Sequence, residues 1–155
     1  MEHNFLEFEC TGLKNDGKFP MEYTGRGENR SPEFIIKNLS SHAVTLMITL
    51  EDLSHPIQKF THWIIWNIPA TDIIQKAIPV GRTVSSLHNA VQGIAYGFHR
   101  YAGPKPPKGR CHKYCFTIYV LDCKLSLSSF STKRNVLAKS RGHIIQQGKI
   151  YGYFG

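Results

Sequence analysis

The sequence predicts an all-β fold, an antiparallel β-sandwich with a few short peripheral helices, built from residues 1–155 as one domain. The apolar runs are short and rich in β-branched and aromatic residues, which favour strands. Turn-forming residues separate these runs. With 155 residues and 41% hydrophobic content, the chain is long enough to bury a core between two layers.

Four strand candidates lie in the first half of the chain. They are Phe5 to Cys10, Phe34 to Ile36, Ala43 to Leu50, and His62 to Ile68. Residues 15–18 carry an Asn-Asp-Gly turn signal, and residues 24–32 form a polar, Gly-containing loop. Pro69 ends the fourth candidate because proline has no N–H to donate to a sheet.

The second half contains the best helix and the best central strand. Residues 69–97 are predicted to be mostly irregular, with a helical turn at Thr71 to Ala77. Tyr114 to Leu121 is the candidate for a central strand, and Lys149 to Phe154 is the last strand. Residues 131–139 predict a helix, with Ser131 or Thr132 as its N-cap and Gly142 as its stop. There is no repeat, low-complexity tract or linker.

Charge is distributed unevenly along the chain, whose net charge is +8. Residues 101–155 hold ten lysines and arginines and a single acid, Asp122, which gives +9, whereas residues 1–100 hold nine basic and ten acidic residues. A basic half attracts phosphates, lipid head groups, nucleic acid or acidic protein surfaces, although a solvated basic surface is the favoured explanation of the charge alone. The basic residues are scattered and no nucleic-acid-binding signature is present, so nucleic acid is not favoured as a partner.

Localisation and cysteine chemistry follow from what the sequence contains. No apolar run reaches the roughly 18 residues needed to span a bilayer, and the N-terminus lacks a secretory signal pattern. A cytoplasmic protein with four reduced thiols is therefore expected. On a strand, Cys111 and Cys115 would lie about 13 Å apart, too far for one metal ion or a disulfide. Both are predicted to be buried small hydrophobes, and no metal or cofactor is expected.

A proline-rich loop followed by polar strand residues predicts a binding pocket. The segment Gly103-Pro-Lys-Pro-Pro-Lys-Gly109 is stiff because proline fixes φ. In the strand that follows, His112 and Tyr114 lie two residues apart and therefore share a face. A rigid loop beside an imidazole and a phenol is typical of a small-molecule or anion pocket. The alternative is that both side chains bond neighbouring backbone.

A second polar segment supplies a carboxylate and another imidazole. Glu51-Asp52-Leu-Ser-His-Pro56 leads into His62-Trp63, again with polar residues at a strand end beside proline. Taken alone, Asp52 reads as a turn or cap residue and His62 as a satisfied strand histidine. Their joint appearance with the first segment favours a site.

These segments resemble conserved blocks of the phosphatidylethanolamine-binding protein family, which includes Raf kinase inhibitor proteins and plant flowering regulators. The chain is most similar to the short bacterial branch. The first block, Asp52 to Pro56 with His62-Trp63, is similar to the family's Asp-Pro-Asp-Ala-Pro and His-Trp. The second, Gly103 to Gly109 with His112-Lys113-Tyr114, is similar to Gly-Pro-x-Pro-Pro and His-Arg-Tyr. Weaker likenesses lie at residues 29–32, 142–145 and 151–153.

The resemblance implies an antiparallel β-sandwich with a small anion pocket. On the family pattern this pocket is lined by Asp52, Pro56, His62, Pro107, His112 and Tyr114. Ser54 stands where the family has its second Asp, and Lys113 where it has Arg, which removes a bidentate donor. Histidine N–H groups and the tyrosine hydroxyl can donate to phosphate, while Asp52 orients a histidine rather than touching the anion.

Three functions are compatible with these residues. The favoured one is a binding protein for a phosphate-bearing ligand, such as a phospholipid head group, a nucleotide or a phosphorylated side chain. The second, which the resemblance implies, is a regulator whose basic face docks on a kinase or another signalling enzyme. The third is a hydrolase that uses the His/Asp/Tyr pocket for acid–base chemistry; it is less favoured because no activated nucleophile is visible. Homodimerisation is implied by the resemblance alone.

Overall fold

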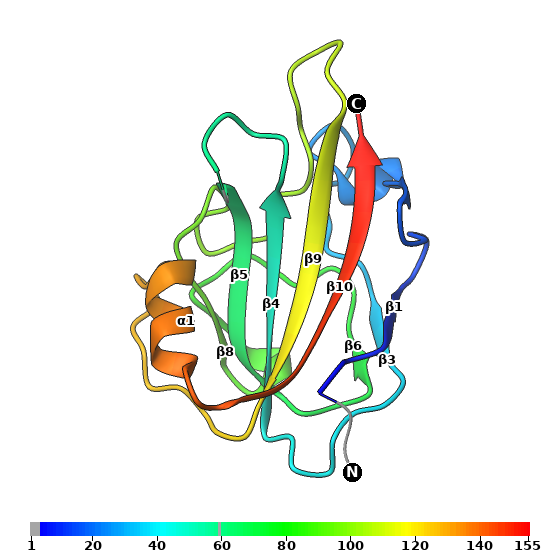
Figure 1. The fold of residues 1–155 in the computed structure, drawn as a ribbon. Helices are drawn as coiled ribbons and strands as arrows, with labels where there is room; N and C mark the ends of the chain where they lie inside the picture. Colours follow the sequence, from blue (N-terminus) through cyan, green and yellow to red (C-terminus); the bar gives the residue numbers. More distant parts are fainter. Residues whose placement is uncertain (1–3, 59) are drawn as a thin grey trace.

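The computed structural model describes residues 4–58 and 60–155, which fold into two packed β-sheets (Figure 1). Within these residues, seven strands form the larger sheet, in the order β2-β10-β9-β4-β5-β8-β7, and three form the smaller, in the order β1-β3-β6. The strands are β1 (Phe8–Cys10), β2 (Gly17–Lys18), β3 (Phe34–Ile36), β4 (Thr45–Asp52), β5 (Phe60–Pro69), β6 (Ile73–Ile74), β7 (Thr83–Val84), β8 (Ala90–Gln92), β9 (His112–Leu121) and β10 (Ile144–Phe154). The same residues contain two short 3-10 helices and one α-helix: η1 (Met21–Tyr23), η2 (Ser85–Leu87) and α1 (Lys133–Ser140). The predicted antiparallel sandwich is confirmed, with one parallel pair, β2 and β10.

The main core fills the space between the two sheets. Phe34 of the smaller sheet meets Phe116 of the larger one edge to face, with ring centroids 5.1 Å apart. A second apolar cluster lies on the outer face of the larger sheet, where Met47, Trp66 and Tyr119 pack near Val136 of α1. The central strands β4, β5 and β9 are therefore buried on both faces. This explains why their sequences are continuous apolar runs rather than alternating ones.

Helix α1 forms where the sequence predicts it. The Thr132 hydroxyl accepts from the Asn135 N–H, and the Asn135 side chain accepts from the Thr132 N–H, so the two residues make a reciprocal cap. Gly142 follows the helix with a φ of +82°, a left-handed conformation that favours glycine. In Figure 1 the helix lies beside β5, and its Val136 belongs to the apolar cluster on the outer face of the larger sheet.

The prediction for residues 71–77 was wrong, because this segment contains strand β6 and no helical turn. Ile73 and Ile74 pair with Ile35 and Phe34 of β3, and Ile74 is fully buried while Ile73 is exposed. Pairing with a distant strand and burial of one β-branched side chain outweigh the local helical pattern. Strands β7 and β8 also lie in the segment predicted to be irregular. Strand β10 begins at Ile144 rather than at Lys149, and β1 covers only the end of the predicted first strand.

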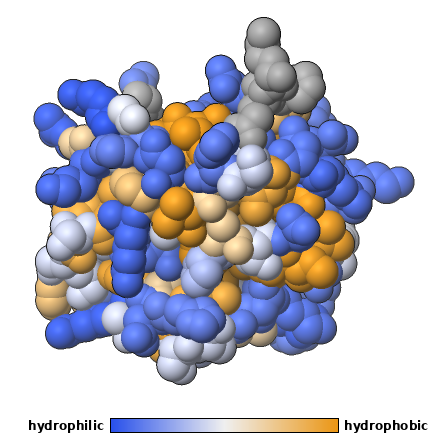
Figure 2. Space-filling view, turned by 90° about the horizontal axis from the view of Figure 1, so that it is seen from below, coloured by the Kyte–Doolittle hydropathy of each residue, from blue (hydrophilic) through white to orange (hydrophobic). Residues whose placement is uncertain are grey.

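The two ends of the sandwich differ. The loops formed by residues 53–58 and 102–111 project from one end (Figure 1), and the opposite end shows apolar patches broken up by polar side chains (Figure 2). Among the described residues, no helix is long and apolar enough to cross a membrane.

Candidate anion-binding site

Strand order brings the polar residues of three strands to one end of the larger sheet. Strand β4 lies between β5 and β9, and Asp52, at its end, is in register with Phe60 on β5 and Tyr114 on β9. His62 follows Phe60 by two residues on β5, and His112 precedes Tyr114 by two residues on β9. Both histidines therefore lie near Asp52. The two sequence segments predicted to form a pocket therefore meet in space.

His112 and Asp52 form a buried hydrogen-bonded pair. The Nδ1–H of His112 donates to Oδ2 of Asp52 at 2.8 Å, and the carboxylate is 3% exposed. The other oxygen, Oδ1, accepts from the Ser54 N–H at 2.9 Å. Both carboxylate oxygens thus have donors, which fixes the imidazole ring and leaves its Nε2 as the atom free for another partner.

His62 is held by backbone instead of by a carboxylate. Its Nδ1–H donates to the Ala102 carbonyl at 2.9 Å, which fixes the tautomer because a carbonyl only accepts. Burial lowers the pKa of His62 below its ordinary 6.5, and the Ala102 carbonyl and Asp52 offset this only in part. The ring is therefore neutral near pH 7, with a lone pair on Nε2. It donates through Nε2 only after taking up a proton.

Tyr114 lies behind the two imidazoles. Its ring is fully buried and meets His62 edge to face at 5.5 Å between centroids, with the His112 ring at 6.2 Å. Its hydroxyl makes no hydrogen bond of standard geometry. Burial and the nearby Asp52 raise its pKa, and the Lys105 backbone lowers it only in part, so the hydroxyl keeps its proton. It is a buried donor without a good acceptor.

These groups adjoin a cavity of about 750 Å³ whose rim is basic. Three exposed cations, Arg26, Lys105 and Arg110, line it. Within the described part of the chain, Asp52 is the single carboxylate in the lining, and its charge is already engaged by two donors. The rim of the cavity therefore carries a net positive charge.

An aromatic wall closes one side of the cavity. The His55 ring stacks on Phe60 with centroids 3.9 Å apart, and Tyr96 lies 5.0 Å from His62 and 5.8 Å from Phe60. Tyr96 is more than half exposed, so its face is accessible to a ligand. This wall offers apolar surface beside the polar groups.

The other side of the cavity is formed by two interlocked loops. The Arg26 guanidinium donates to the Pro106 carbonyl, and the Gly25 N–H donates to that of Pro104. Gly103 is packed so closely that an added Cβ would lie 2.0 Å from the Tyr23 carbonyl oxygen, so only glycine fits there. Loop 24–30 thus supports the proline-rich loop.

Five of the six predicted site residues line the cavity: Asp52, Pro56, His62, Pro107 and His112. Tyr114 lies behind the lining. Sequence reasoning missed Arg26, Lys105, Arg110, His55, Phe60 and Tyr96. For Phe60 a signal existed, because it lies two residues before His62 and shares its strand face. For Arg26 none did, because a distant loop places it.

The two departures from the family pattern have local explanations. The Ser54 hydroxyl oxygen accepts from the Lys113 N–H at 2.9 Å, and the Leu53 N–H donates to the Lys113 carbonyl, so the loop after β4 is fastened to β9. The Lys113 ammonium lies over the Tyr151 ring, 4.6 Å from its centroid. Lys113 is not among the residues that line the cavity.

The prediction that Cys111 is a buried hydrophobe was wrong. Cys111 is exposed because it lies in the loop before β9, whereas Cys115, inside that strand, is buried. Burial raises the pKa of the Cys115 thiol, so it remains protonated. All four cysteines are free thiols, as the sequence predicts.

A larger hollow of about 1110 Å³ lies beside α1, away from these residues. It contains Thr61, Lys133 and Arg134 in its lining, but the Lys133 ammonium is paired with Glu51 at 2.6 Å. None of the predicted site residues reaches it.

The fold and this cavity define a class of β-sandwich proteins with a small polar hollow at one end of the larger sheet's central strands. Residues 11–155 match the phosphatidylethanolamine-binding protein family, and the chain belongs to this family. A UPF0098 protein of Pyrococcus abyssi is 37% identical over 142 residues, which cover 90% of this chain and 80% of the relative. A UPF0098 protein of Methanothermobacter thermautotrophicus is 34% identical over 152 residues, which cover 96% and 98%.

Solved structures share the fold. A phosphatidylethanolamine-binding protein homolog from Chlamydia trachomatis superposes with a TM-score of 0.83 at 24% identity, and the match covers 99% of each chain. YbcL of Escherichia coli, a member of the mammalian family by its description, gives 0.84 at 23% identity over 96% of this chain and 97% of its own. At these identities the likeness concerns the architecture alone.

Proposed function

We propose that the cavity binds the phosphate group of a small ligand or of a phosphorylated side chain. The observation that carries the proposal is the meeting of His62 and His112 at a cavity with three cations on its rim and its one carboxylate engaged. Both imidazoles use Nδ1 for internal bonds, so both offer Nε2 to a ligand. Phosphate oxygens accept charge-assisted hydrogen bonds from protonated imidazole.

The proposal includes proton uptake. His62 is neutral when the site is free, because burial lowers its pKa. A phosphate oxygen near Nε2 would favour the protonated ring, because opposite charges attract more strongly away from bulk water. Binding is therefore coupled to protonation and strengthens as the pH falls towards 6.

The aromatic wall suits the remainder of the ligand. Tyr96 presents an exposed ring beside the phosphate position, and such aromatic faces attract organic cations. The family's name points to phosphoethanolamine, whose ammonium fits this description. A nucleoside or a peptide chain would also pack on the same surface.

Isothermal titration calorimetry of the full chain tests the proposal, with inorganic phosphate as the first probe. Phosphoethanolamine, adenosine monophosphate and phosphoserine then distinguish the source of the phosphate. In His112→Ala the phosphate affinity should fall by about tenfold or more, because one charge-assisted bond is lost. His88→Asn is the matched control: His88 is exposed, lies outside the lining and has a φ of 51°, which asparagine tolerates.

Equal phosphate affinity in wild type and His112→Ala would contradict the proposal. Because His112→Ala also unpairs Asp52, Arg110→Gln provides a second variant that keeps the buried pair. It should weaken phosphate binding several-fold at low salt and much less at high salt, because exposed charges are screened.

The His112–Asp52 pair also favours a second candidate, a hydrolase, since a carboxylate-oriented imidazole is a general base. Ser54 contributes an aliphatic hydroxyl to the cavity lining, and its oxygen accepts from the Lys113 N–H. Rates on phosphoester and ester substrates should be measured for wild type and His112→Ala. Equal rates would exclude this histidine as the base.

A further inference from the structure

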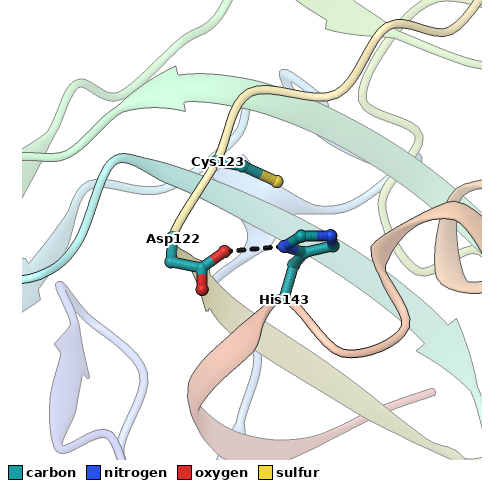
Figure 3. A group of neighbouring side chains, drawn as sticks. All are labelled: Asp122, Cys123 and His143. Atoms are coloured by element: carbon teal, nitrogen blue, oxygen red, sulfur yellow. Dashed lines mark hydrogen bonds and ion pairs between the residues drawn. The ribbon is translucent and has the colours of Figure 1, made fainter.

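Three metal-ligating side chains gather at the end of the larger sheet opposite the cavity. Asp122 and Cys123 follow strand β9, and His143 precedes strand β10 (Figure 3). Strand β9 runs from His112 at the cavity to Leu121 beside this cluster, about 30 Å at the rise of a strand. The cluster is therefore separate from the proposed anion site.

Backbone hydrogen bonds hold the cluster together. Leu121 and Ile144 are partners in the β9–β10 ladder, and the Asp122 N–H donates to the His143 carbonyl at 3.0 Å. The Thr45 hydroxyl donates to the Cys123 carbonyl at 2.7 Å, which fastens the chain after β9 to the start of β4. The donor residues thus lie next to the paired ends of β9 and β10, which limits the ordering that a ligand would require.

The distances between the donor atoms suit a tetrahedral ion. One carboxylate oxygen of Asp122, the Sγ of Cys123 and one ring nitrogen of His143 all lie within 4.8 Å of one another. In a tetrahedral zinc site neighbouring ligand atoms are about 3.3–3.6 Å apart, as bond lengths of about 2.0–2.3 Å require. A side-chain movement of about 1 Å closes the longest edge. Asp122 and His143 are half exposed, so their side chains have room for it.

We propose that Asp122, Cys123 and His143 bind a zinc ion, with water in the fourth position. A thiolate, an imidazole and a carboxylate form a donor set typical of zinc, whereas calcium and magnesium require oxygen ligands. On binding, the thiol proton of Cys123 leaves to solvent and a Zn–S bond forms. The His143 proton moves from Nδ1, which now donates to Asp122 at 2.8 Å, to Nε2, so Nδ1 binds the metal.

Charge in this half of the chain does not itself attract a metal ion. Asp122 is the single acid in residues 101–155, which carry ten lysines and arginines. A long-range attraction for cations is therefore absent in this half, and affinity must come from coordination by sulfur and nitrogen. The competing explanation is a surface hydrogen bond between His143 and Asp122, with Cys123 nearby by chance.

Cobalt(II) and zinc titrations of the full chain distinguish the two explanations. The experiment uses the Cys111→Ser background, because Cys111 is an exposed thiol that would also bind cobalt, whereas Cys123 is partly buried. Cobalt should produce a thiolate-to-cobalt charge-transfer band and intense visible bands typical of a tetrahedral site, and one equivalent of zinc should abolish them. Cys123→Ser should remove the charge-transfer band. His143→Gln and Asp122→Asn should weaken cobalt and zinc binding by at least about tenfold each.

Matched controls separate this site from the histidines of the cavity. His62→Ala and His88→Asn should leave the cobalt spectrum unchanged. Zinc should raise the thermal unfolding midpoint of the parent chain but not that of Cys123→Ser, because only a native-state ligand stabilises. The proposal is overturned if cobalt yields no charge-transfer band, if the band survives in Cys123→Ser, or if His62→Ala removes it.

Discussion

The Nδ1 atom of His112 lies 2.8 Å from Oδ2 of Asp52, although 60 positions separate the two residues in the chain. Strand pairing causes this contact, because Asp52 at the end of β4 is in register with Tyr114, two residues beyond His112 on β9. The same carboxylate binds the Ser54 N–H. Asp52 therefore joins the loop after β4 to the imidazole that faces the cavity.

Removal of this carboxylate should lower both stability and phosphate affinity. Asp52→Ala leaves the Ser54 N–H and the His112 Nδ1–H without their acceptor, which should cost about 1–3 kcal/mol of unfolding free energy. The freed imidazole should also bind phosphate more weakly. Urea denaturation and calorimetry measure the two effects. The control is Asp72→Ala at an exposed carboxylate, which should change neither; an equal loss of stability in both variants would contradict this role for Asp52.

Acid should destabilise the protein through His62. Because the folded chain holds the pKa of His62 below its ordinary 6.5, the unfolded chain takes up more protons in that window. The unfolding free energy should therefore fall as the pH drops below about 6.5, by about 1.4 kcal/mol for each unit of pKa lowering. Denaturation curves from pH 8 to pH 5 measure the effect.

His62→Asn provides the comparison, because its amide nitrogen can still donate to the Ala102 carbonyl but does not titrate. The other histidines contribute equally to both proteins, so the difference between the two pH profiles isolates His62. Parallel profiles would show that burial does not perturb this ring.

The Tyr114 hydroxyl should matter for binding rather than for folding. It is buried without a good acceptor, so Tyr114→Phe should leave the unfolding free energy unchanged or raise it by up to about 1 kcal/mol. If the hydroxyl donates to bound phosphate, the affinity of this variant should fall by about tenfold. Calorimetry and urea denaturation on the same samples decide. A large loss of stability would mean that the hydroxyl has a structural partner.

Two substitutions at Ser54 should separate loop anchoring from cavity charge. Ser54→Ala removes the acceptor for the Lys113 N–H and should cost about 0.5–1.5 kcal/mol of unfolding free energy, with phosphate affinity unchanged. Ser54→Asp keeps an acceptor there but adds a negative charge to the cavity lining. Its stability should be near that of wild type, while phosphate affinity falls about fivefold, roughly 1 kcal/mol. If both variants changed stability and phosphate affinity in the same way, loop anchoring and cavity charge would not be separable at Ser54.

Local sequence information was sufficient to predict elements that depend on short-range interactions or on long apolar runs. Thr132 and Gly142 mark the ends of α1 through short-range bonding and backbone conformation, and the β-branched runs of β4, β5 and β9 are buried on both faces. The short strand β6 was missed because its two residues are extended only through pairing with β3. Strand existence there depends on a partner distant in sequence.

The site shows the same division. Proline and histidine segments resembling the family blocks identified the residues of β4, β5, β9 and the proline-rich loop. Arg26 was not predicted, because a hydrogen bond to the Pro106 carbonyl, 80 residues away in the chain, places it at the cavity. The lowered pKa of His62 was not predicted either. It depends on burial and on the hydrogen bond to the Ala102 carbonyl, which cannot be read from the sequence.

The bonds between residues 24–30 and residues 102–107 bear on any attempt to exchange ligand preference between relatives. Arg26 holds Pro106, Gly25 holds Pro104, and the Asn29 side chain accepts from the Gly103 N–H at 2.7 Å. A chimaera that takes only one of these segments from a relative would lose the hydrogen bonds that join the two segments. Transplantation of specificity therefore requires both segments from the same donor protein.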